Sequence, residues 1–316
     1  MISSRQYRML PFRTTATCRP HVLVVPAVML AVVLAFWWPG PLLATETPAP
    51  VRHVILLSLD GARADALRSA MPTSLLVRAS VSWTAQTISP SLTLPAHASM
   101  LSGVAPWKHR ITFNDWREGD PEFAQRTIFT EVRRVDGRTA AIVHKSKLQM
   151  LAPRAVVDWV HTLAYPRFRQ ADVVEYAARF FLERRPRLLV VHVADPDDAG
   201  HRYGWMTTEY LRVIARVPVL IERLLRAFED GGVGSQSLLV VTADHGGHGR
   251  THGTNHAEDM TIPWLVFGAR AQAGEIVSRQ IVTYDTAATI LDALGIPVPI
   301  DWHGRAVRDA LRHRPP

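Results

Sequence analysis

Short runs of consecutive apolar and branched side chains, separated by longer amphipathic stretches, restrict the fold of this sequence more than any other feature. The runs occupy residues 54–59, 139–143, 188–193, 238–241 and 264–267. Uniformly apolar strands are typical of parallel sheets that helices cover on both faces. The stretches at residues 171–184 and 209–229 carry apolar side chains at three- and four-residue spacing, with arginine and glutamate between them. The alternation predicts an α/β fold with a mostly parallel central sheet and helices on both faces.

The first fifty residues differ in composition from the remainder. Four arginines precede an uncharged apolar stretch at residues 22–38, and small residues follow it. This order is typical of a secretory signal, although the stretch approaches the roughly 20 residues that span a bilayer. We interpret residues 1–44 as a signal peptide or N-terminal membrane anchor, residues 45–50 as a linker and residues 51–312 as one domain. Both interpretations predict export to the periplasm or extracellular space, with residues 22–38 as the tether if the segment is retained.

Charge and cysteine content exclude several classes of protein. The formal net charge is +8, and half of it comes from Arg5, Arg8, Arg13 and Arg19. No basic run interleaved with aromatic residues follows residue 50, so no nucleic-acid-binding surface is evident. The only cysteine, Cys18, precedes the apolar stretch, which rules out disulfides and thiolate metal sites within the exported part.

Polar side chains follow three of the apolar runs. Asp60 comes directly after the first run, and Asp244 and His245 come shortly after the fourth. Asp197 and His201 follow the third run at a spacing of four, which places them on one side of a helical turn. Ligands of open α/β sheets bind beyond the carboxyl ends of the strands, so these side chains are candidates for the functional site. Carboxylate and imidazole together suit zinc, manganese or a similar divalent ion.

Two further segments supply candidate residues. His248, His252 and His256 lie in a glycine-rich stretch that is better suited to a loop around a site than to a helix face. Pro95 favours a helix start that leaves Thr93 at or just before the helix N-terminus, and Gly103 can end that helix. Thr93 is then either an N-cap residue or a nucleophile beside the free amides, where a phosphate would bind.

Taken together, these segments resemble the type I phosphodiesterase and nucleotide pyrophosphatase family of the alkaline phosphatase superfamily. The resemblance runs from about residue 51 to 308, and its motifs occur in the family's order. The motifs are Asp60-Gly61, Thr93-Leu94-Pro95-Ala96-His97, Asn114, Pro196-Asp197-x-x-Gly200-His201, Asp244-His245-Gly246, Thr251-His252-Gly253 and the segment from Tyr284 to Leu291 with Gly304-Arg305. The resemblance implies an alkaline-phosphatase-like catalytic domain at residues 51–312.

The family pattern implies a site with two divalent metal ions. Zinc is the first choice, and manganese or another divalent ion is the alternative. One ion would be held by Asp60, Thr93, Asp244 and His245, and the other by Asp197, His201 and His252, with His248 and His256 as alternatives to the last. Thr93 would be the nucleophile that forms a phosphothreonine intermediate, and Asn114 would stabilise the charge on the phosphoryl oxygens.

The implied substrate is a small-molecule or lipid phosphate ester, with phosphodiesters or nucleotide pyrophosphates preferred. Leu94 and Ala96 replace the aromatic motif that stacks on a nucleotide base in the family, while Trp116, Tyr203 and Trp205 are other aromatic candidates. A sulfatase is disfavoured because no arginine completes its nucleophile motif after Thr93. A phosphomonoesterase or phosphonate hydrolase of the same superfamily is the alternative. A tethered binding protein without activity is a more distant one.

Overall fold

The computed structural model describes residues 50–312. The predicted signal or anchor at residues 1–44 and nearly all of the predicted linker lie outside the described residues. Within residues 50–312, no helix has the length and apolar character needed to cross a bilayer.

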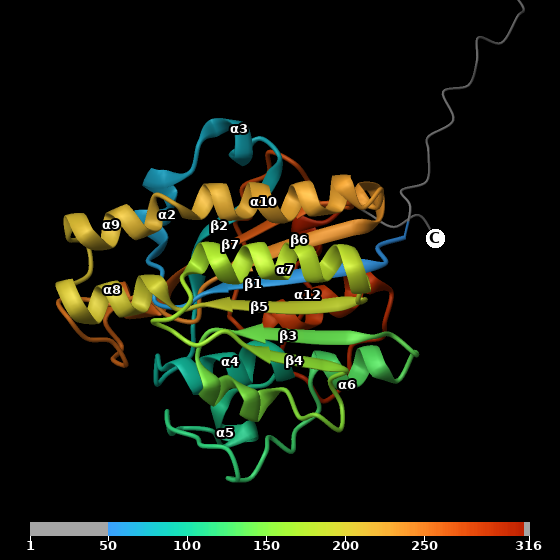
Figure 1. The fold of residues 1–316 in the computed structure, drawn as a ribbon, viewed down its shortest axis with the longest axis horizontal. Helices are drawn as coiled ribbons and strands as arrows, with labels where there is room; N and C mark the ends of the chain where they lie inside the picture. The colour runs from blue at the N-terminus through green and yellow to red at the C-terminus, as the bar shows by residue number, and fades with distance from the viewer. Residues whose placement is uncertain (1–49, 313–316) are drawn as a thin grey trace, which may run out of the picture. The chain divides into compact units, whose positions relative to one another are not determined.

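A seven-stranded sheet forms the centre of the domain, in the order β2-β7-β6-β1-β5-β3-β4 (Figure 1). The strands are β1 (His53–Leu59), β2 (Ala79–Gln86), β3 (Thr139–Val143), β4 (Trp159–Thr162), β5 (Leu188–Val193), β6 (Ser237–Thr242) and β7 (Thr261–Gly268). The neighbours β6-β1-β5-β3-β4 pair in parallel, whereas β7 is antiparallel to both β6 and β2. The prediction of a mostly parallel sheet is confirmed.

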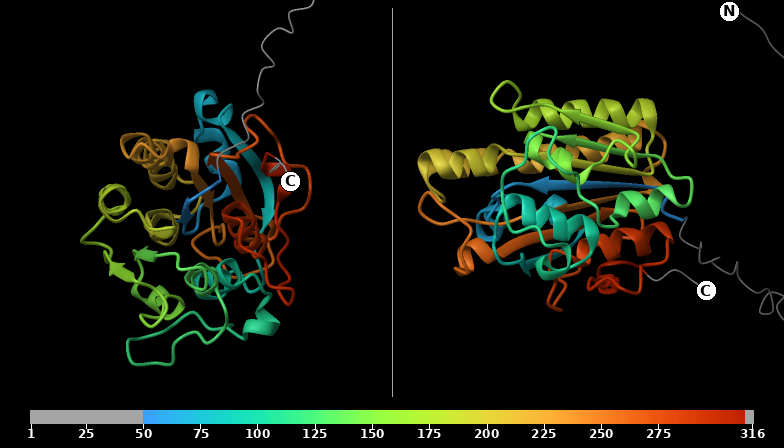
Figure 2. Two further views of the ribbon diagram at one scale, coloured as in Figure 1. Left: turned by 90° about the vertical axis from the view of Figure 1, so that its right-hand side faces the viewer. Right: turned by 90° about the horizontal axis from the view of Figure 1, so that it is seen from below.

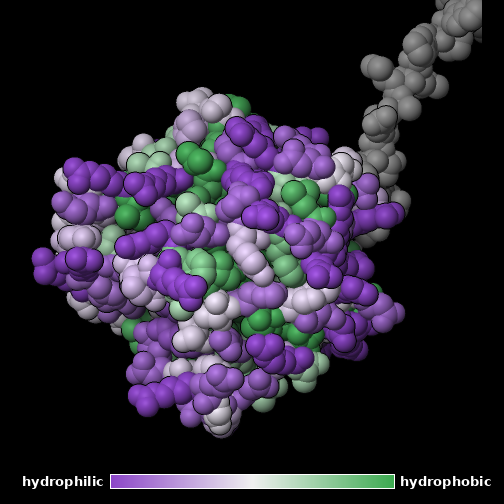
Figure 3. Space-filling view, viewed as in Figure 1, coloured by the Kyte–Doolittle hydropathy of each residue, from purple (hydrophilic) through white to green (hydrophobic). Residues whose placement is uncertain are grey.

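Helices cover both faces of this sheet, as the sequence predicts (Figure 2). α7 (Gln170–Arg184) and α10 (Val217–Asp230) pack side by side on one face, against β5 and β6 respectively. α4 (Thr93–Ser102), α6 (Ile128–Arg133) and α12 (Asp285–Leu294) pack together on the other. The outer surface over α7 and α10 is dominated by hydrophilic side chains (Figure 3). The remaining elements are α2 (Ala64–Ala70), α3 (Thr73–Leu76), α5 (Pro106–His109), α8 (Asp195–Tyr203), α9 (Thr208–Ile214), α11 (Ala257–Met260), η1 (Ser146–Leu151), η2 (Gly234–Gln236) and η3 (Arg308–Ala310).

The continuous apolar runs form the interior strands. Every residue of β3, β5 and β6 is buried, and so is every residue of β1 after His53. Side chains of both strand faces are therefore removed from water, which explains why these segments lack the polar alternation of a half-exposed strand.

The structure differs from the sequence prediction at three elements. β2 carries serine, threonine and glutamine between its apolar residues, and β4 is a four-residue edge strand whose side chains are all partly exposed. Neither has a continuous apolar run, so neither was predicted. The single helix predicted for residues 209–229 is two helices, because α9 ends before Ala215 and Pro218 opens the first turn of α10.

Candidate active site and metal centre

The carboxyl ends of β1, β5 and β6 bring the predicted side chains to one edge of the sheet. Asp60 directly follows β1, and Asp197 lies in the first turn of α8, which begins two residues after β5. Asp244 and His245 follow β6, where the chain leaves regular structure. All four residues are almost completely buried. Parallel strands that are hydrogen-bonded to each other must end at the same edge, and this explains how residues far apart in sequence meet.

Thr93 is the first residue of α4 and is buried at the same edge. The N-cap position belongs to Leu92, which makes no side-chain capping bond, so Thr93 is not the N-cap residue of this helix. Its Oγ1 atom lies 3.4 Å from Nε2 of His245. The helix ends as predicted at Gly103, whose φ of 68° is left-handed. The threonine hydroxyl thus faces the carboxylate and imidazole groups instead of the helix backbone.

The first candidate metal cluster joins Asp60, Asp244 and His245. One ligand atom from each residue lies within 4.8 Å of the others. Nε2 of His245 is 3.5 Å from Asp60 Oδ1 and 3.4 Å from Asp244 Oδ2. Gly61 permits this arrangement, because its φ of 69° turns the chain and its N–H donates to Asp244 Oδ1. With Thr93 Oγ1 beside it, the cluster contains the four predicted ligands of one ion.

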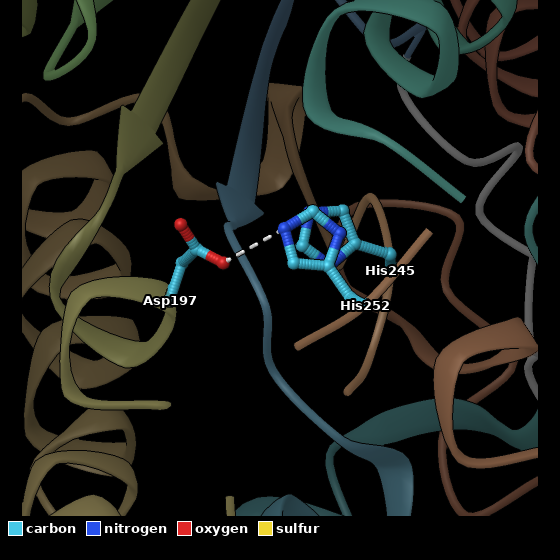
Figure 4. A group of neighbouring side chains, drawn as sticks. All are labelled: Asp197, His245 and His252. Carbon is cyan, nitrogen blue, oxygen red and sulfur yellow. Dashed lines mark ion pairs between the residues drawn. The ribbon is translucent and has the colours of Figure 1, made fainter. Parts of the chain in front are cut away.

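The second candidate cluster surrounds Asp197. Its Oδ1 atom is 3.4 Å from Nε2 of His201 and 3.6 Å from Nε2 of His252. Figure 4 shows His252 facing Asp197 and lying against His245, and the two rings are stacked with centroids 3.7 Å apart. His245 can be grouped with Asp197 and His252 as well as with the first cluster. The two predicted metal positions are therefore adjacent, and the stacked rings of His245 and His252 lie beside both of them.

The three histidines present the same nitrogen to the carboxylates. Nδ1 of each ring bonds to a main-chain carbonyl oxygen, at 2.8 Å for His245, 2.9 Å for His252 and 3.0 Å for His201. A carbonyl oxygen only accepts, so Nδ1 carries a proton in each ring and Nε2 is the atom that faces the site. Burial lowers the pKa of His245, and burial together with His245 lowers the pKa of His252 to about 4. Neutral imidazoles fixed in this way are typical of metal ligands.

Three carboxylate oxygens in these clusters lack any hydrogen-bond donor among the described residues. They are Asp60 Oδ1, Asp197 Oδ1 and Asp244 Oδ2. Each lies within 3.6 Å of an imidazole Nε2 that has no proton to donate. Burying a carboxylate without a donor or a cation is costly, so such oxygens are rare in folded proteins. The donor set of oxygen and imidazole nitrogen therefore fits divalent metal ions.

Lys145 is a member of the site that the sequence analysis did not identify. It follows β3 at the same sheet edge, and its Nζ lies 2.7 Å from Asp60 Oδ2 and 2.5 Å from Asp197 Oδ2. Burial alone would lower the pKa of Lys145, but the two carboxylates raise it above its ordinary value. This ammonium balances one of the three carboxylate charges of Asp60, Asp197 and Asp244. Asp60 was predicted because it follows an apolar run. Lys145 comes two residues after another such run, so the same criterion would also have identified it.

Asn114 and a second lysine lie beside the N-terminus of α4. Asn114 Oδ1 accepts hydrogen bonds from the Leu94 N–H at 3.0 Å and from Lys147 Nζ at 2.9 Å. With the oxygen occupied by these donors, the amide nitrogen of Asn114 remains for other partners. Burial, followed by the charge of Lys145, lowers the pKa of Lys147. Lys147 is also absent from the predicted site.

Two buried histidines, His192 and His97, form hydrogen bonds to residues of the first cluster. His192 Nε2 lies 2.9 Å from Asp60 Oδ2, and its Nδ1 accepts the His144 N–H. Nε2 must then carry the proton, which orients the Asp60 carboxylate. His97 forms two hydrogen bonds of 2.8 Å each, one from Nδ1 to the Thr93 carbonyl oxygen and one between Nε2 and the Ser58 hydroxyl. His97 belongs to the Thr93–His97 motif of the sequence analysis, but neither histidine was predicted to be a site residue.

Among the other candidates from the sequence, Trp205 packs against the rings of His201 and His252, with centroids 5.1 and 5.9 Å away. His248 bonds to Asp259 at 2.7 Å and stacks on His256, so the structure places His252, and not these two, against Asp197. Trp205 is buried and donates its Nε1–H to the Gly61 carbonyl. Tyr203 is 41% exposed and Trp116 is half-buried.

The sheet architecture, the buried threonine and the paired carboxylate-histidine clusters define a member of the alkaline phosphatase superfamily. The chain belongs to the type I phosphodiesterase / nucleotide pyrophosphatase family, whose model matches residues 54–260.

Solved structures of related fold cover most of the chain at low sequence identity. Human ectonucleotide pyrophosphatase / phosphodiesterase 5 has a TM-score of 0.69 and 16% identity, covering 83% of this chain and 100% of that one. The phosphonate monoester hydrolase from Silicibacter pomeroyi has a TM-score of 0.61 and 17% identity, covering 82% and 76%.

Curated relatives match over shorter segments. The extracellular sulfatase SULF-1 homolog of Drosophila melanogaster is 27% identical over 133 residues, which is 40% of this chain and 12% of that protein. The phosphopentomutase of Desulfitobacterium hafniense is 28% identical over 125 residues, which is 39% of this chain and 30% of that protein. The chain thus matches less than a third of either relative's length.

Proposed function

We propose that this protein hydrolyses phosphate esters with the aid of two divalent metal ions and through a phosphothreonine intermediate. The observation that carries the proposal is the position of Thr93 Oγ1, which lies beside His245 Nε2 at a site with three unpartnered carboxylate oxygens. A hydroxyl in this setting is suited to act as a nucleophile once cations are present. The family match supports the same reaction class.

The residues divide between two proposed metal positions. Asp60, Thr93, Asp244 and His245 would hold one ion, and Asp197, His201 and His252 the other. When bound, such ions lower the pKa of a coordinated hydroxyl and stabilise negative charge on phosphoryl oxygens. Zinc is our first choice because carboxylate oxygen and imidazole nitrogen are ligands that suit it, with manganese as the alternative.

The chain's own groups carry the remaining steps. Thr93 Oγ loses its proton, attacks phosphorus and forms the Thr93–phosphorus bond while the bond to the leaving oxygen breaks, and the leaving alcohol takes up one proton, so the proton count is unchanged. The Asn114 amide nitrogen and the Thr93 N–H at the start of α4 are suited to bind the equatorial phosphoryl oxygens, because Pro95 has no N–H and the Leu94 and Ala96 N–H groups already donate to Asn114 and Leu92. Water then attacks phosphorus, the bond to Thr93 breaks, and the threonine hydroxyl regains its proton.

The proposed substrates are phosphodiesters or nucleotide pyrophosphates, of small-molecule or lipid type. This preference rests on the family match and on a structural neighbour, murine ectonucleotide pyrophosphatase / phosphodiesterase 5, whose inactive variant was solved in complex with AMP. Leu94 and Ala96 are both fully buried and offer no aromatic surface to a nucleotide base. Phosphate monoesters and phosphonates remain the second candidate class. We further propose an exported protein, with residues 22–38 as a cleaved signal or a membrane tether.

Hydrolysis of model substrates tests the proposal. Bis(p-nitrophenyl) phosphate, p-nitrophenyl phosphate and p-nitrophenyl sulfate would be supplied to the purified protein with zinc or manganese, and with EDTA. We expect phosphate-ester turnover that EDTA abolishes and added metal restores. Thr93→Ala should remove the activity, whereas Thr73→Ala, which alters an exposed threonine at the first residue of α3, should retain it.

Trapping the intermediate tests the role of Thr93 directly. Acid quenching during turnover should leave one phosphoryl group on the peptide that contains Thr93, as detected by mass spectrometry. Preferential sulfate ester hydrolysis, or full activity in Thr93→Ala, would overturn the assignment. Inactivity of the metal-loaded protein on all three substrates would favour the tethered binding protein.

A further inference from the structure

Lys147 is a cation at the site, and the reaction proposed above assigns it no role. It lies at the start of η1, two residues after Lys145, and is half-buried beside Asn114. Lys145 is engaged by two carboxylates, but Lys147 forms no ion pair with any described residue. Among residues 50–312, its Nζ donates a hydrogen bond to Asn114 Oδ1 alone, at 2.9 Å. An ammonium group has three N–H donors, so this contact leaves two of them available.

The position of Lys147 is fixed relative to the nucleophile. Asn114 Oδ1 accepts from Lys147 and also from the N–H of Leu94, the residue after Thr93. The ammonium is therefore one hydrogen-bonded residue away from the start of α4, where phosphoryl oxygens would bind.

We propose that Lys147 binds a non-bridging phosphoryl oxygen and gives this site phosphomonoesterase activity in addition to diester hydrolysis. The inference rests on the proposed function. A diester presents one negative charge on its phosphoryl group, whereas a monoester carries close to two at neutral pH, because its second pKa is about 6. The amide nitrogen of Asn114 and the N–H of Thr93 are neutral donors that suit a single charge. A lysine beside them supplies the charge-assisted hydrogen bond that the second anionic oxygen requires.

The monoester reaction uses the same bonds as the diester reaction. The Thr93 hydroxyl gives up its proton and the Thr93 Oγ–phosphorus bond forms as the ester oxygen–phosphorus bond breaks, while the leaving alcohol takes up one proton in exchange. Water then replaces Thr93 on phosphorus, which releases inorganic phosphate and restores the hydroxyl. Lys147 changes no bond and keeps its protons, so its contribution is to bind the anionic oxygen in the ground and transition states.

Two substrates with a common leaving group separate this role from a structural one. We would measure kcat/KM of the metal-loaded protein on p-nitrophenyl phosphate and on methyl p-nitrophenyl phosphate. A hydrogen bond to a charged group contributes about 1.5–3 kcal/mol, which corresponds to roughly 10- to 100-fold. Lys147→Gln should therefore lower kcat/KM on the monoester by about 10- to 100-fold, and on the diester by less than about threefold. Lys147→Arg should restore most of the monoester activity.

A control variant and an equilibrium measurement complete the test. Arg117→Gln removes an exposed cation three residues after Asn114 and should leave both activities within about twofold. Inorganic phosphate should inhibit diester hydrolysis about tenfold less strongly in Lys147→Gln, which reports binding of the doubly charged group without monoester turnover.

The outcomes distinguish this inference from the proposed function. A wild-type protein that hydrolyses the diester but not the monoester would overturn the role of Lys147 and leave the proposed function standing. Equal loss on both substrates in Lys147→Gln, or no loss on either, would overturn it in the same way. A metal-loaded wild-type protein that is inactive on both substrates would overturn the inference together with the proposed function.

Discussion

Replacing Asp244 with asparagine should stabilise the metal-free protein while weakening metal binding. Asp244 is completely buried, and its Oδ2 faces a lone pair of His245 without a hydrogen-bond donor. Burial, followed by the charge of Asp60, raises the pKa of Asp244 well above its ordinary value. Asparagine keeps an oxygen to accept from the Gly61 and His245 N–H groups, and its amide nitrogen can donate toward His245 Nε2.

The magnitude follows from the cost of a buried polar group without a partner, about 1–3 kcal/mol. We therefore expect Asp244→Asn to raise the free energy of unfolding in EDTA by about 1–3 kcal/mol at pH 7. At about 2–4 °C per kcal/mol, the expected rise in Tm is several degrees. A carboxyl whose folded-state pKa is raised costs stability only when it is ionised in the unfolded state. The gain should thus be absent below about pH 4 and should grow as pH rises toward the shifted pKa.

Asp259 provides a matched control because it is an equally buried carboxylate whose oxygens have donors. It accepts hydrogen bonds from His248 and from the N–H and hydroxyl of Thr254. Burial acts to raise the pKa of Asp259, but these hydrogen bonds hold the pKa below its ordinary value. Asp259→Asn should therefore destabilise the protein in EDTA, in the opposite direction to Asp244→Asn.

Thermal unfolding by circular dichroism with EDTA and with excess zinc gives the measurement. Metal binding stabilises the wild type by mass action and should stabilise Asp244→Asn much less, so the order of the two proteins should reverse between the conditions. An Asp244→Asn protein that is less stable than the wild type in EDTA would show that the carboxylate has a partner in the folded protein. The argument for a cation site at Asp60 and Asp244 would then fail.

Two further predictions concern histidines. His252→Ala should lower the metal content per chain by one ion, as measured by mass spectrometry, whereas His248→Ala should keep both ions; the reverse result would move the ligand to His248. Burial lowers the pKa of His109 to about 4, so the unfolded chain binds a proton near pH 6.5 that the folded protein does not bind until about pH 4. Stability should be complete above pH 6.5 and fall by up to about 3 kcal/mol as pH drops to 4, which urea unfolding at several pH values measures. His109→Asn should flatten this dependence while keeping an acceptor for the Ile111 N–H; an unchanged slope would show that other groups cause it.

The interior of the sheet and much of the candidate site could be predicted because they obey one local rule. β3 and β5 coincide with predicted apolar runs, and β1 and β6 extend them by one or two residues. Asp60, Asp197 and Asp244 were selected because they follow such runs, and parallel pairing then brings the strand ends together. β2 and β4 were not predicted because their residues are partly polar or exposed. Their place in the sheet depends on pairing with β7 and β3, which no local pattern records.

The choice among the loop histidines illustrates what local sequence cannot decide. His248, His252 and His256 recur at equal spacing in one glycine-rich segment, so their spacing gives no reason to prefer any of them. The structure separates them through partners that are distant in sequence. The Ser91 carbonyl, 161 residues away, fixes the His252 ring toward Asp197, while Asp259 engages His248. Because these partners are distant in sequence, the metal-binding histidine can be identified only from the folded structure or from a family pattern.

The two lysines show that the electrostatic balance of the site is also a property of the fold. In the sequence, Lys145 and Lys147 resemble ordinary charged residues after a strand. Their roles appear only when charges from four elements are counted together. Three carboxylates meet at the edge formed by β1, α8 and β6, and Lys145 from the end of β3 offsets one of them. The remaining negative charge is what divalent ions would neutralise. Once those ions are bound, Lys147 is the cation left beside Asn114 for an anionic substrate. Under the proposals made above, the carboxylate charges that Lys145 does not offset account for the metal ions, and Lys147 accounts for the binding of a doubly charged phosphoryl group.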